Sequence, residues 1–488
     1  MQANGVRSTP AQRWMLALTS IAALMITLDA LVVSTALNTI RTDLGASLES
    51  LEWTVNAYGL SYAVLMMTGS ALGDRLGRRR VLVVGLAVFT AASAACALAP
   101  DIGWLIAARA VQGAGGALIM PVAMALVSSA FPAQQRARAT GLFVAILGLG
   151  VVGGPVVGGA VSEALSWQWI FWLNVPIGVV LIPLILARIE ESVRSAAGMD
   201  GGGVLLVTGA AFGAVWGLVR GNTAGWASPE VLVSLAGGAV LTVAFVRWEL
   251  RSRVPMLPMH LFRVRTFAVS NACGFLLFAS NFSSVFLISQ YLQAERGYSP
   301  LQAGLRMLPW TVTILALAPL AGWLQTRLGV RRLVSGGLAL QGLGIGLVAL
   351  LARSGASYST MVLPLVLAGC GISMAMPSAQ NAVVSAVPPD MIGKASGTYN
   401  TLRQLGGAFG VAVAVAVFAA TGSYASPAAF DDGFVAALGV SAALPVIAAV
   451  AALALPRRRT GSSPASPSAA AAAGPDEPAV AATELARA

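Results

Sequence analysis

Residues Ser70-Ala-Leu-Gly-Asp-Arg-Leu-Gly-Arg-Arg-Arg80 join two apolar runs, 57–72 and 81–98, that read as membrane spans. The join holds four arginines, and short arginine-rich loops stay on the cytoplasmic side, so it fixes the orientation of the chain. Asp74 can accept charge-assisted hydrogen bonds from a guanidinium or a helix N-terminus, and Gly77 allows a tight reversal. A merely basic loop would explain the arginines but not Asp74 with Gly77 at this spacing. We therefore predict a clasp between helices in this basic loop, formed by Asp74, Arg75, Gly77 and Arg78.

The composition is that of a membrane-embedded chain. Of 488 residues, 57% are hydrophobic and only 10% are charged, far outside the soluble range. Spans of about 20 residues would allow up to about fourteen helices. The net charge of +11 comes from cations in loops on one side, which is typical of membrane orientation and not of a nucleic-acid-binding face. We expect contact with a lipid bilayer and no nucleic-acid partner.

Residue types that metal sites and enzymes need are scarce. The three cysteines, Cys96, Cys273 and Cys370, lie far apart in apolar segments without a ligand pattern and read as packing residues. The one histidine, His260, lies in a loop, which argues against a zinc site and a histidine proton relay. We expect no metal, no cofactor, no catalytic residue and no enzyme activity.

Two charged residues fall inside predicted spans. Asp29 lies in the middle of the first span and Arg109 in the fourth. Charges at these depths are costly and are functional hypotheses by default. Asp29 is also the buried acid nearest to Arg109 by span order. We predict that Asp29 carries a proton and that Arg109 tunes or receives it, with a purely structural ion pair as the alternative.

The fifth span contains the run Gly150-Val-Val-Gly-Gly154-Pro155-Val-Val-Gly158-Gly159. Glycines four residues apart make a flat packing face, and Pro155 removes a backbone hydrogen bond and bends the helix. From the residues alone this helix is either a pivot or seal, or an ordinary packing helix.

Three motifs resemble those of a known family. The basic loop resembles the loop between spans 2 and 3 of the major facilitator superfamily, with Ser70 where glycine is usual. The glycine–proline run resembles the motif of facilitator antiporters rather than symporters. The segment Trp167-Gln-Trp-Ile-Phe-Trp-Leu-Asn-Val-Pro-Ile-Gly178 resembles the signature of the 14-span drug:proton antiporters of the EmrB/QacA type, with Gln168 where arginine is usual. The resemblance implies an all-α integral membrane fold of 14 transmembrane helices, in two six-helix bundles with two inserted central helices.

The spans and loops divide the chain into five predicted parts. These are a cytoplasmic N-terminus (1–13), an N-terminal six-helix bundle (14–190), two inserted helices (200–250), a C-terminal six-helix bundle (266–455) and a disordered cytoplasmic tail (457–488). The second bundle repeats the first, because Arg75-Leu-Gly77 recurs as Arg327-Leu-Gly329. Two repeated halves indicate a rocking transporter with its site between them.

Polar and aromatic residues within the spans are candidates for lining a substrate cavity. Packing and interfacial positions are the alternative for the tyrosines and phenylalanines, and an arginine that extends to the headgroups is the alternative for Arg403. The candidates are Asn56, Tyr58, Tyr62, Gln112, Phe278, Asn281, Phe282, Asn400, Arg403 and Gln404.

The resemblance implies efflux of a drug or antibiotic-like small molecule across the bacterial cytoplasmic membrane by alternating access. Protonmotive force would drive the exchange for protons, the basic loop would close the cytoplasmic gate, and both termini would lie in the cytoplasm. An uptake symporter of the same fold is the first alternative, although it should lack the Gly154-Pro155 run. A membrane sensor or enzyme is the second. Substrate identity, proton stoichiometry, oligomeric state and any adaptor protein stay open.

Overall fold

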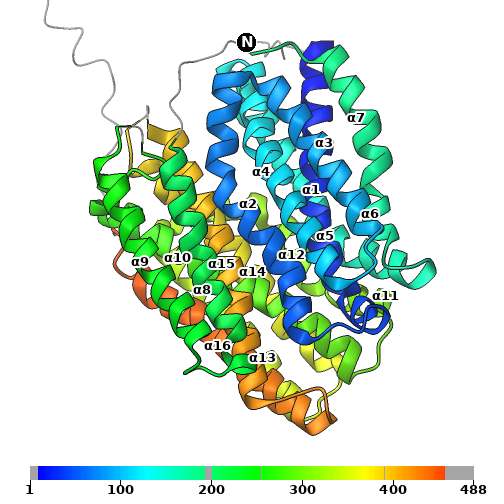
Figure 1. The fold of residues 1–488 in the computed structure, drawn as a ribbon. Coiled ribbons are helices and arrows are strands. Elements are labelled where there is room, and N and C mark those ends of the chain that lie inside the picture. The colour runs from blue at the N-terminus through cyan, green and yellow to red at the C-terminus, as the bar shows by residue number, and fades with distance from the viewer. Residues whose placement is uncertain (1–8, 193–199, 254, 389–390, 457–488) are drawn as a thin grey trace, which may run out of the picture. The chain divides into compact units, whose positions relative to one another are not determined.

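The protein is seen in a computed structural model that describes residues 9–192, 200–253, 255–388 and 391–456. Within these ranges all regular structure is helical (Figure 1). Twelve helical segments of the described residues are long and apolar enough to cross a membrane, which confirms an all-α membrane-spanning fold; two of them join neighbouring helical elements. The predicted tail, 457–488, and most of the N-terminal segment lie outside the described residues.

The first part of the chain forms seven helices. They are α1 (Pro10–Asp43), α2 (Leu48–Leu76), α3 (Arg78–Ala97), α4 (Ile102–Ala130), α5 (Ala133–Ala164), α6 (Trp169–Trp172) and α7 (Asn174–Arg188). Thr9 and Gln12 form a capping box at the start of α1, with Pro10 at a position where its missing N–H is not needed. The Asp101 side chain likewise caps α4, accepting from the backbone N–H of Trp104 at 2.9 Å.

Two helices follow, and then a second set. The pair is α8 (Gly201–Ala224) and α9 (Pro229–Arg251). The second set, after the 3₁₀ turn η1 (Met259–Arg263), is α10 (Arg265–Gln290), the π-helical η2 (Tyr291–Glu295), α11 (Pro300–Arg306), α12 (Leu308–Leu328), α13 (Val330–Arg353), α14 (Tyr358–Ser385), α15 (Ile392–Thr421) and α16 (Pro427–Ala452). We call α1–α7 the first half and α10–α16 the second half.

The two halves repeat one helix arrangement. In the first, α4 contacts α2 and α3, and α1 contacts α5; in the second, α14 contacts α12 and α13, and α10 contacts α15. The turns correspond as well, since Gly77 before α3 has φ 105° and Gly329 before α13 has φ 80°. Glycine adopts these positive values without a steric penalty. The Arg-Leu-Gly recurrence in the sequence therefore marks a repeated turn.

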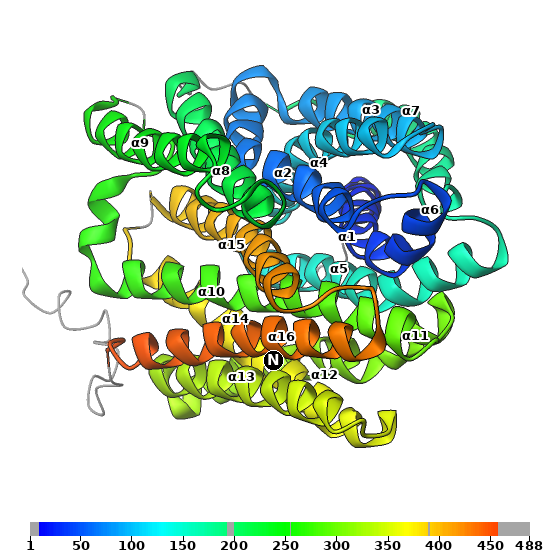
Figure 2. The same ribbon diagram turned by 60° about the horizontal axis from the view of Figure 1, so that its bottom comes forward.

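The helices α8 and α9 pack on each other, and α8 also contacts α2 and α15 (Figure 2). The ring of Trp53 in α2 lies 5.8 Å from that of Phe212 and 5.5 Å from that of Trp216, both in α8. Arg220 of α8 pairs with Glu49 of α2 at 3.3 Å. The pair is thus attached to the side of the molecule where α2 meets α15.

The two ends of the bundle are packed differently. At the end holding Asp43, one buried core joins residues of both halves, such as Leu37 of α1 and Leu287 of α10. At the end holding Gly77, each half has its own core, around Leu82 in the first and Val334 in the second. The helices α2 and α15 contact each other across the halves. The halves are therefore closed together at the Asp43 end, with separate cores at the Gly77 end.

Candidate functional site

A buried ion pair joins two helices inside the first half. Arg109 Nη1 of α4 donates to Asp29 Oδ2 of α1 at 2.5 Å. The two residues are only 1% and 2% exposed, respectively, so neither charge is screened by solvent. Inside a membrane each would be expensive alone, and the pairing is what makes their burial tolerable.

Amide side chains complete the coordination of Asp29. Its Oδ1 accepts from Gln112 Nε2 and from Asn174 Nδ2, both at 2.9 Å. Ser93 Oγ accepts from the same two amide nitrogens, at 3.2 and 3.1 Å, and donates to the backbone carbonyl of Phe171 at 2.9 Å. Both carboxylate oxygens of Asp29 therefore have hydrogen-bond donors.

The guanidinium of Arg109 has partners besides Asp29. Nη1 also donates to Gln112 Oε1 at 2.7 Å, and Nε donates to the carbonyl of Thr54 at 3.3 Å. The guanidinium carbon lies 4.2 Å from the ring centroid of Tyr58 and 5.7 Å from that of Phe171, which allows cation–π attraction. The residues of the network lie on α1, α2, α3, α4, α6 and α7, so its geometry depends on how these helices of the first half pack together.

The ion pair was predicted from the sequence, but part of its network was not. Asn174 stands inside the quoted Trp167–Gly178 segment as a lone amide in an apolar run, which was a usable signal. Ser93 had no such signal, because serine is common in apolar helices as a small packing residue. The role of Asp29 and Arg109 in proton coupling remains a prediction.

The basic loop is bonded within the first half. Arg78 donates to Asp74 Oδ1 from Nη2 at 2.9 Å and from Nε at 3.1 Å, so the predicted partner of the carboxylate is a guanidinium of its own turn. The backbone N–H of Arg78 donates to Ser192 Oγ at 2.9 Å, and Arg75 is exposed.

Glu191 is a residue of this loop region that the sequence did not reveal. Its carboxylate accepts from the backbone N–H groups of Arg79 and Arg80 at 3.0 and 3.2 Å, and so caps α3. The same carboxylate fills the space where a Cβ on Gly77 would lie, 2.6 Å away. The positive φ of Gly77 and the Glu191 carboxylate beside it therefore both favour glycine at this position.

The glycine–proline run places α5 between the two halves. A Cβ on Gly150, Gly154 or Gly158 would meet α1 of the same half, for example Leu31 Cβ at 2.7 Å from Gly154. A Cβ on Gly159 would meet the backbone of Pro300 and Leu301 in α11, and the Pro155 carbonyl faces Gly304 of α11. One side of α5 therefore packs within the first half, and the other closes the Asp43 end against the second.

The predicted cavity residues divide into three groups. Gln112 is fully buried in the Asp29 network, so it does not line a cavity in this conformation. The buried Tyr58 and Tyr62 stack at 5.9 Å, and the buried Asn56 donates to Glu52 Oε1 at 3.1 Å. The remaining candidates lie on α10 and α15.

On those two helices the phenylalanines face the neighbouring helix. The Arg403 guanidinium lies 4.5 Å from the ring centroid of Phe278, and a Cβ on Gly407 would lie 3.2 Å from the Phe282 ring. This is the packing alternative for Phe278 and Phe282. The partly accessible positions are Asn281, Phe282, Asn400, Arg403 and Gln404.

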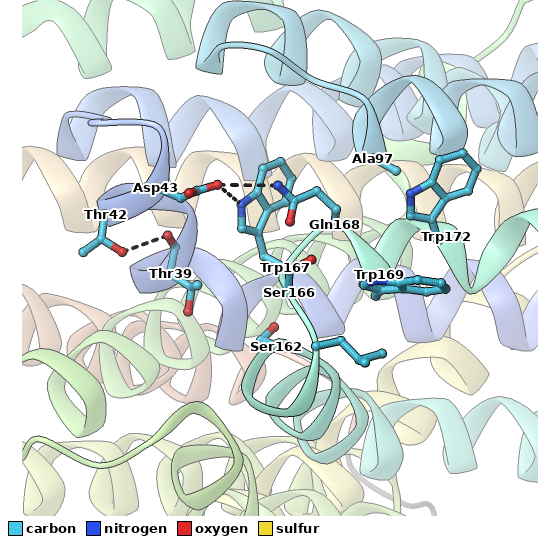
Figure 3. A pocket seen from close by; sticks show the side chains of 11 residues that line it. Thr39, Thr42, Asp43, Ala97, Ser162, Ser166, Trp167, Gln168, Trp169 and Trp172 are labelled. Carbon is cyan, nitrogen blue, oxygen red and sulfur yellow. Dashed lines mark hydrogen bonds between the residues drawn. The ribbon is translucent and has the colours of Figure 1, made fainter.

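A cavity of roughly 730 Å³ lies away from the ion pair, at the Asp43 end (Figure 3). Asp43 accepts there from Trp167 Nε1 at 2.7 Å and from Gln168 Nε2 at 3.5 Å. At 1.5 Å per helical residue, Asp43 is about 21 Å along α1 from Asp29. The Trp167–Gly178 segment nevertheless links the two places, since Trp167 lines the cavity and Asn174 binds Asp29.

Comparisons with known proteins agree with this geometry. A profile described as "Major Facilitator Superfamily" matches residues 19–264 and 271–486. The chain is 36% identical to the multidrug resistance protein Stp of Mycobacterium tuberculosis (strain CDC 1551 / Oshkosh), over 82% of this chain and 75% of that protein. It is 32% identical to the tetracenomycin C resistance and export protein of Streptomyces glaucescens, over 84% and 76% of the two chains. A solved POT family transporter in complex with 5-aminolevulinic acid has the same fold, with a TM-score of 0.70, 15% identity and coverage of 92% and 96%.

Proposed function

The chain belongs to the major facilitator superfamily, and we propose that it exports a drug-like small molecule across the bacterial cytoplasmic membrane in exchange for protons. The observation that carries this proposal is the buried Asp29–Arg109 pair, a protonatable group inside a membrane-spanning bundle. Relatives that share about a third of the sequence carry names of multidrug resistance and antibiotic export. The protein is a transporter and not an enzyme.

The finer architecture proposed is 14 spans with both termini in the cytoplasm. To the twelve apolar helices this adds α2 and α12, which have 29 and 21 residues and repeat each other between the halves. The arginine-rich turn at Gly77 lies on the cytoplasmic side under the positive-inside rule. The helices α8 and α9 are then the inserted central pair, and the closed Asp43 end faces outward.

In this orientation, the shared core at the Asp43 end and the separate cores at the Gly77 end support an inward-open conformation. Substrate enters between the halves from the Gly77 end and contacts partly accessible groups of α10 and α15, among them Asn281 and Arg403. Asp74 and Arg78 are bonded only to each other and to first-half groups among the described residues. The basic loop engages the second half when that end closes.

Protonation of Asp29 is the coupling event. A proton on the carboxylate removes its attraction for Arg109 and turns one acceptor oxygen into a donor that faces the Gln112 and Asn174 amides. A proton gradient worth 100 mV supplies about 2.3 kcal/mol per charge, which is roughly fifty-fold accumulation of a neutral substrate at one proton each.

Reconstitution in liposomes tests the proposal. A pH gradient is imposed, lumenal pH is followed with an entrapped dye, and ethidium or tetracenomycin C is added to wild type, Asp29→Asn and the control Asp101→Asn. Asp101 is a helix cap, and asparagine caps as well as aspartate, so the control keeps its fold. Drug addition should collapse the gradient with wild type and control but not with Asp29→Asn. Drug-driven proton flux through Asp29→Asn would refute the role of Asp29.

A further inference from the structure

A second buried carboxylate lies in the first half and is paired with no cation in the part of the chain that the structure describes. Glu52 of α2 is completely buried, with 0% exposure. Its Oε1 accepts from Asn56 Nδ2 at 3.1 Å, and its Oε2 has no hydrogen-bond partner among the described residues. An ionised carboxylate without a cation or sufficient donors is very unfavourable in such surroundings.

The unpartnered atoms around Glu52 suggest where a proton would go. Asn56 Oδ1, on the same side chain that donates to Glu52, is also buried and unpartnered. Residues four apart on a helix are neighbours, so a protonated Glu52 Oε2 can turn to donate to Asn56 Oδ1. One proton would then complete a two-bond acid–amide pair and satisfy both atoms at once.

The nearby charged groups are all engaged elsewhere. Glu49, one turn earlier on α2, pairs with Arg220 of α8, which also binds Glu230 of α9. On α4, Arg109 is bound to Asp29 of α1, and the Arg41 guanidinium, at the end of α1, lies 3.8 Å from the ring centroid of Tyr424. Arg403 of α15 lies over Phe278. The arginines of α3 are at its start, next to the C-terminal end of α2, whereas Glu52 is near the N-terminal end of α2. Glu52 and Asp29 thus occupy opposite environments within one half.

Glu52 also lies on the face of α2 that is turned toward the second half. Glu52, Asn56 and Gly59 recur at helical spacing on one face of α2. That face meets α15, since a Cβ on Gly59 would lie 4.0 Å from Ala408 Cβ. In the proposed cycle, rocking of the halves would move α2 against α15 and so change the exposure of Glu52.

We propose that Glu52 is a second proton-binding site, which holds a proton in this conformation while Asp29 is ionised. Glu52 takes the proton from water when the Asp43 end is open, and that end closes over Glu52 only in its neutral form. This role rests on the proposed proton-coupled cycle, in which proton uptake outside permits return to the inward-open state. The step transfers a proton from a hydronium ion to one carboxylate oxygen, leaves a water molecule and needs no other reactant.

Infrared difference spectroscopy on the purified, substrate-free protein tests the site directly. Subtracting the Glu52→Gln spectrum from wild type at neutral pH should leave the C=O band of a protonated carboxylic acid. The same subtraction with Asp29→Asn should leave carboxylate bands, and so should the control Glu49→Gln, whose acid is ion-paired. Carboxylate bands in place of the C=O band for Glu52→Gln would overturn the proposal.

Two further measurements keep the test decisive. If Glu52→Gln does not fold, Asn56→Leu should shift the wild-type acid band by removing its amide partner, and an unchanged band would count against the site. The protection of α11 against hydrogen exchange, taken relative to the base-catalysed intrinsic rate at each pH, should fall in alkaline medium for wild type but not for Glu52→Gln, and equal falls would reject the gating role. Absence of drug-linked proton flux with the acid band present would refute the proposed function but keep the site.

Discussion

Gly159→Ala should shift the protein away from the conformation described here without weakening either half. The added Cβ would lie 2.7 Å from Leu301 Cα and closer still to the Pro300 carbonyl, both on α11 of the other half. Real Cβ atoms are not found so near to backbone, and overpacking of this kind costs about 1–3 kcal/mol. Because the contact exists only while the Asp43 end is closed, the penalty falls on that state alone. A difference of that size changes a conformational equilibrium by about 5- to 150-fold.

Gly158→Ala is the matched control, one residue earlier on α5. Its Cβ would lie 2.5 Å from Thr35 Oγ1 and 2.9 Å from Val32 Cα, all within the first half. Hydrogen-exchange mass spectrometry should show faster exchange in α11 for Gly159→Ala, by a factor within the range above. The control should lower the melting temperature and leave the α11 exchange near wild type. Equal α11 exchange in the two variants would refute the assignment of Gly159 to the closed end.

Three further predictions concern stability in detergent, measured by thermal unfolding. Arg109→Gln should lower the free energy of unfolding by about 3–5 kcal/mol, because it leaves the Asp29 carboxylate buried without its cation. Adding Asp29→Asn should recover most of that loss. An undiminished loss in the double variant would contradict the pairing. Asn174→Leu should lose about 1.5–3 kcal/mol, the value of a hydrogen bond to a charged group, so a wild-type melting temperature would argue that Asn174 does not hold Asp29. Gly77→Ala should lower the free energy of unfolding by at least about 1–2 kcal/mol because of the positive φ at this position. Glu191→Ala should lower it by about 0.5–2 kcal/mol through the lost cap of α3. If only Glu191→Ala destabilises the protein, the backbone strain of an alanine at position 77 is negligible.

Composition and local pattern were sufficient for the class of fold. Apolar runs of about 20 residues separated by arginine-rich turns indicate spanning helices, because a helix satisfies its own backbone in the bilayer and a barrel strand needs only about half that length. Glycine at a tight reversal is a local requirement, so Gly77 and its repeat Gly329 were readable, and both have positive φ. The pairing of Asp29 with Arg109 was also predictable, because an unpaired charge in lipid is costly and a pair of opposite charges offsets that cost.

Tertiary structure decided which side chains share a place. The network around Asp29 depends on Ser93 and Asn174, which lie 64 and 145 residues beyond it in the chain and carry no charge pattern that would bring them there. Gln112 was predicted for a cavity, but the packing of α4 on α1 and α3 buries it against the ion pair. The sequence alone also does not distinguish the buried Glu52 from a more exposed acid such as Glu49. The burial of a carboxylate depends on helices from distant parts of the chain. The sequence determines which residues can hold a proton in this protein, and the packing between helices decides which of them are placed to do so.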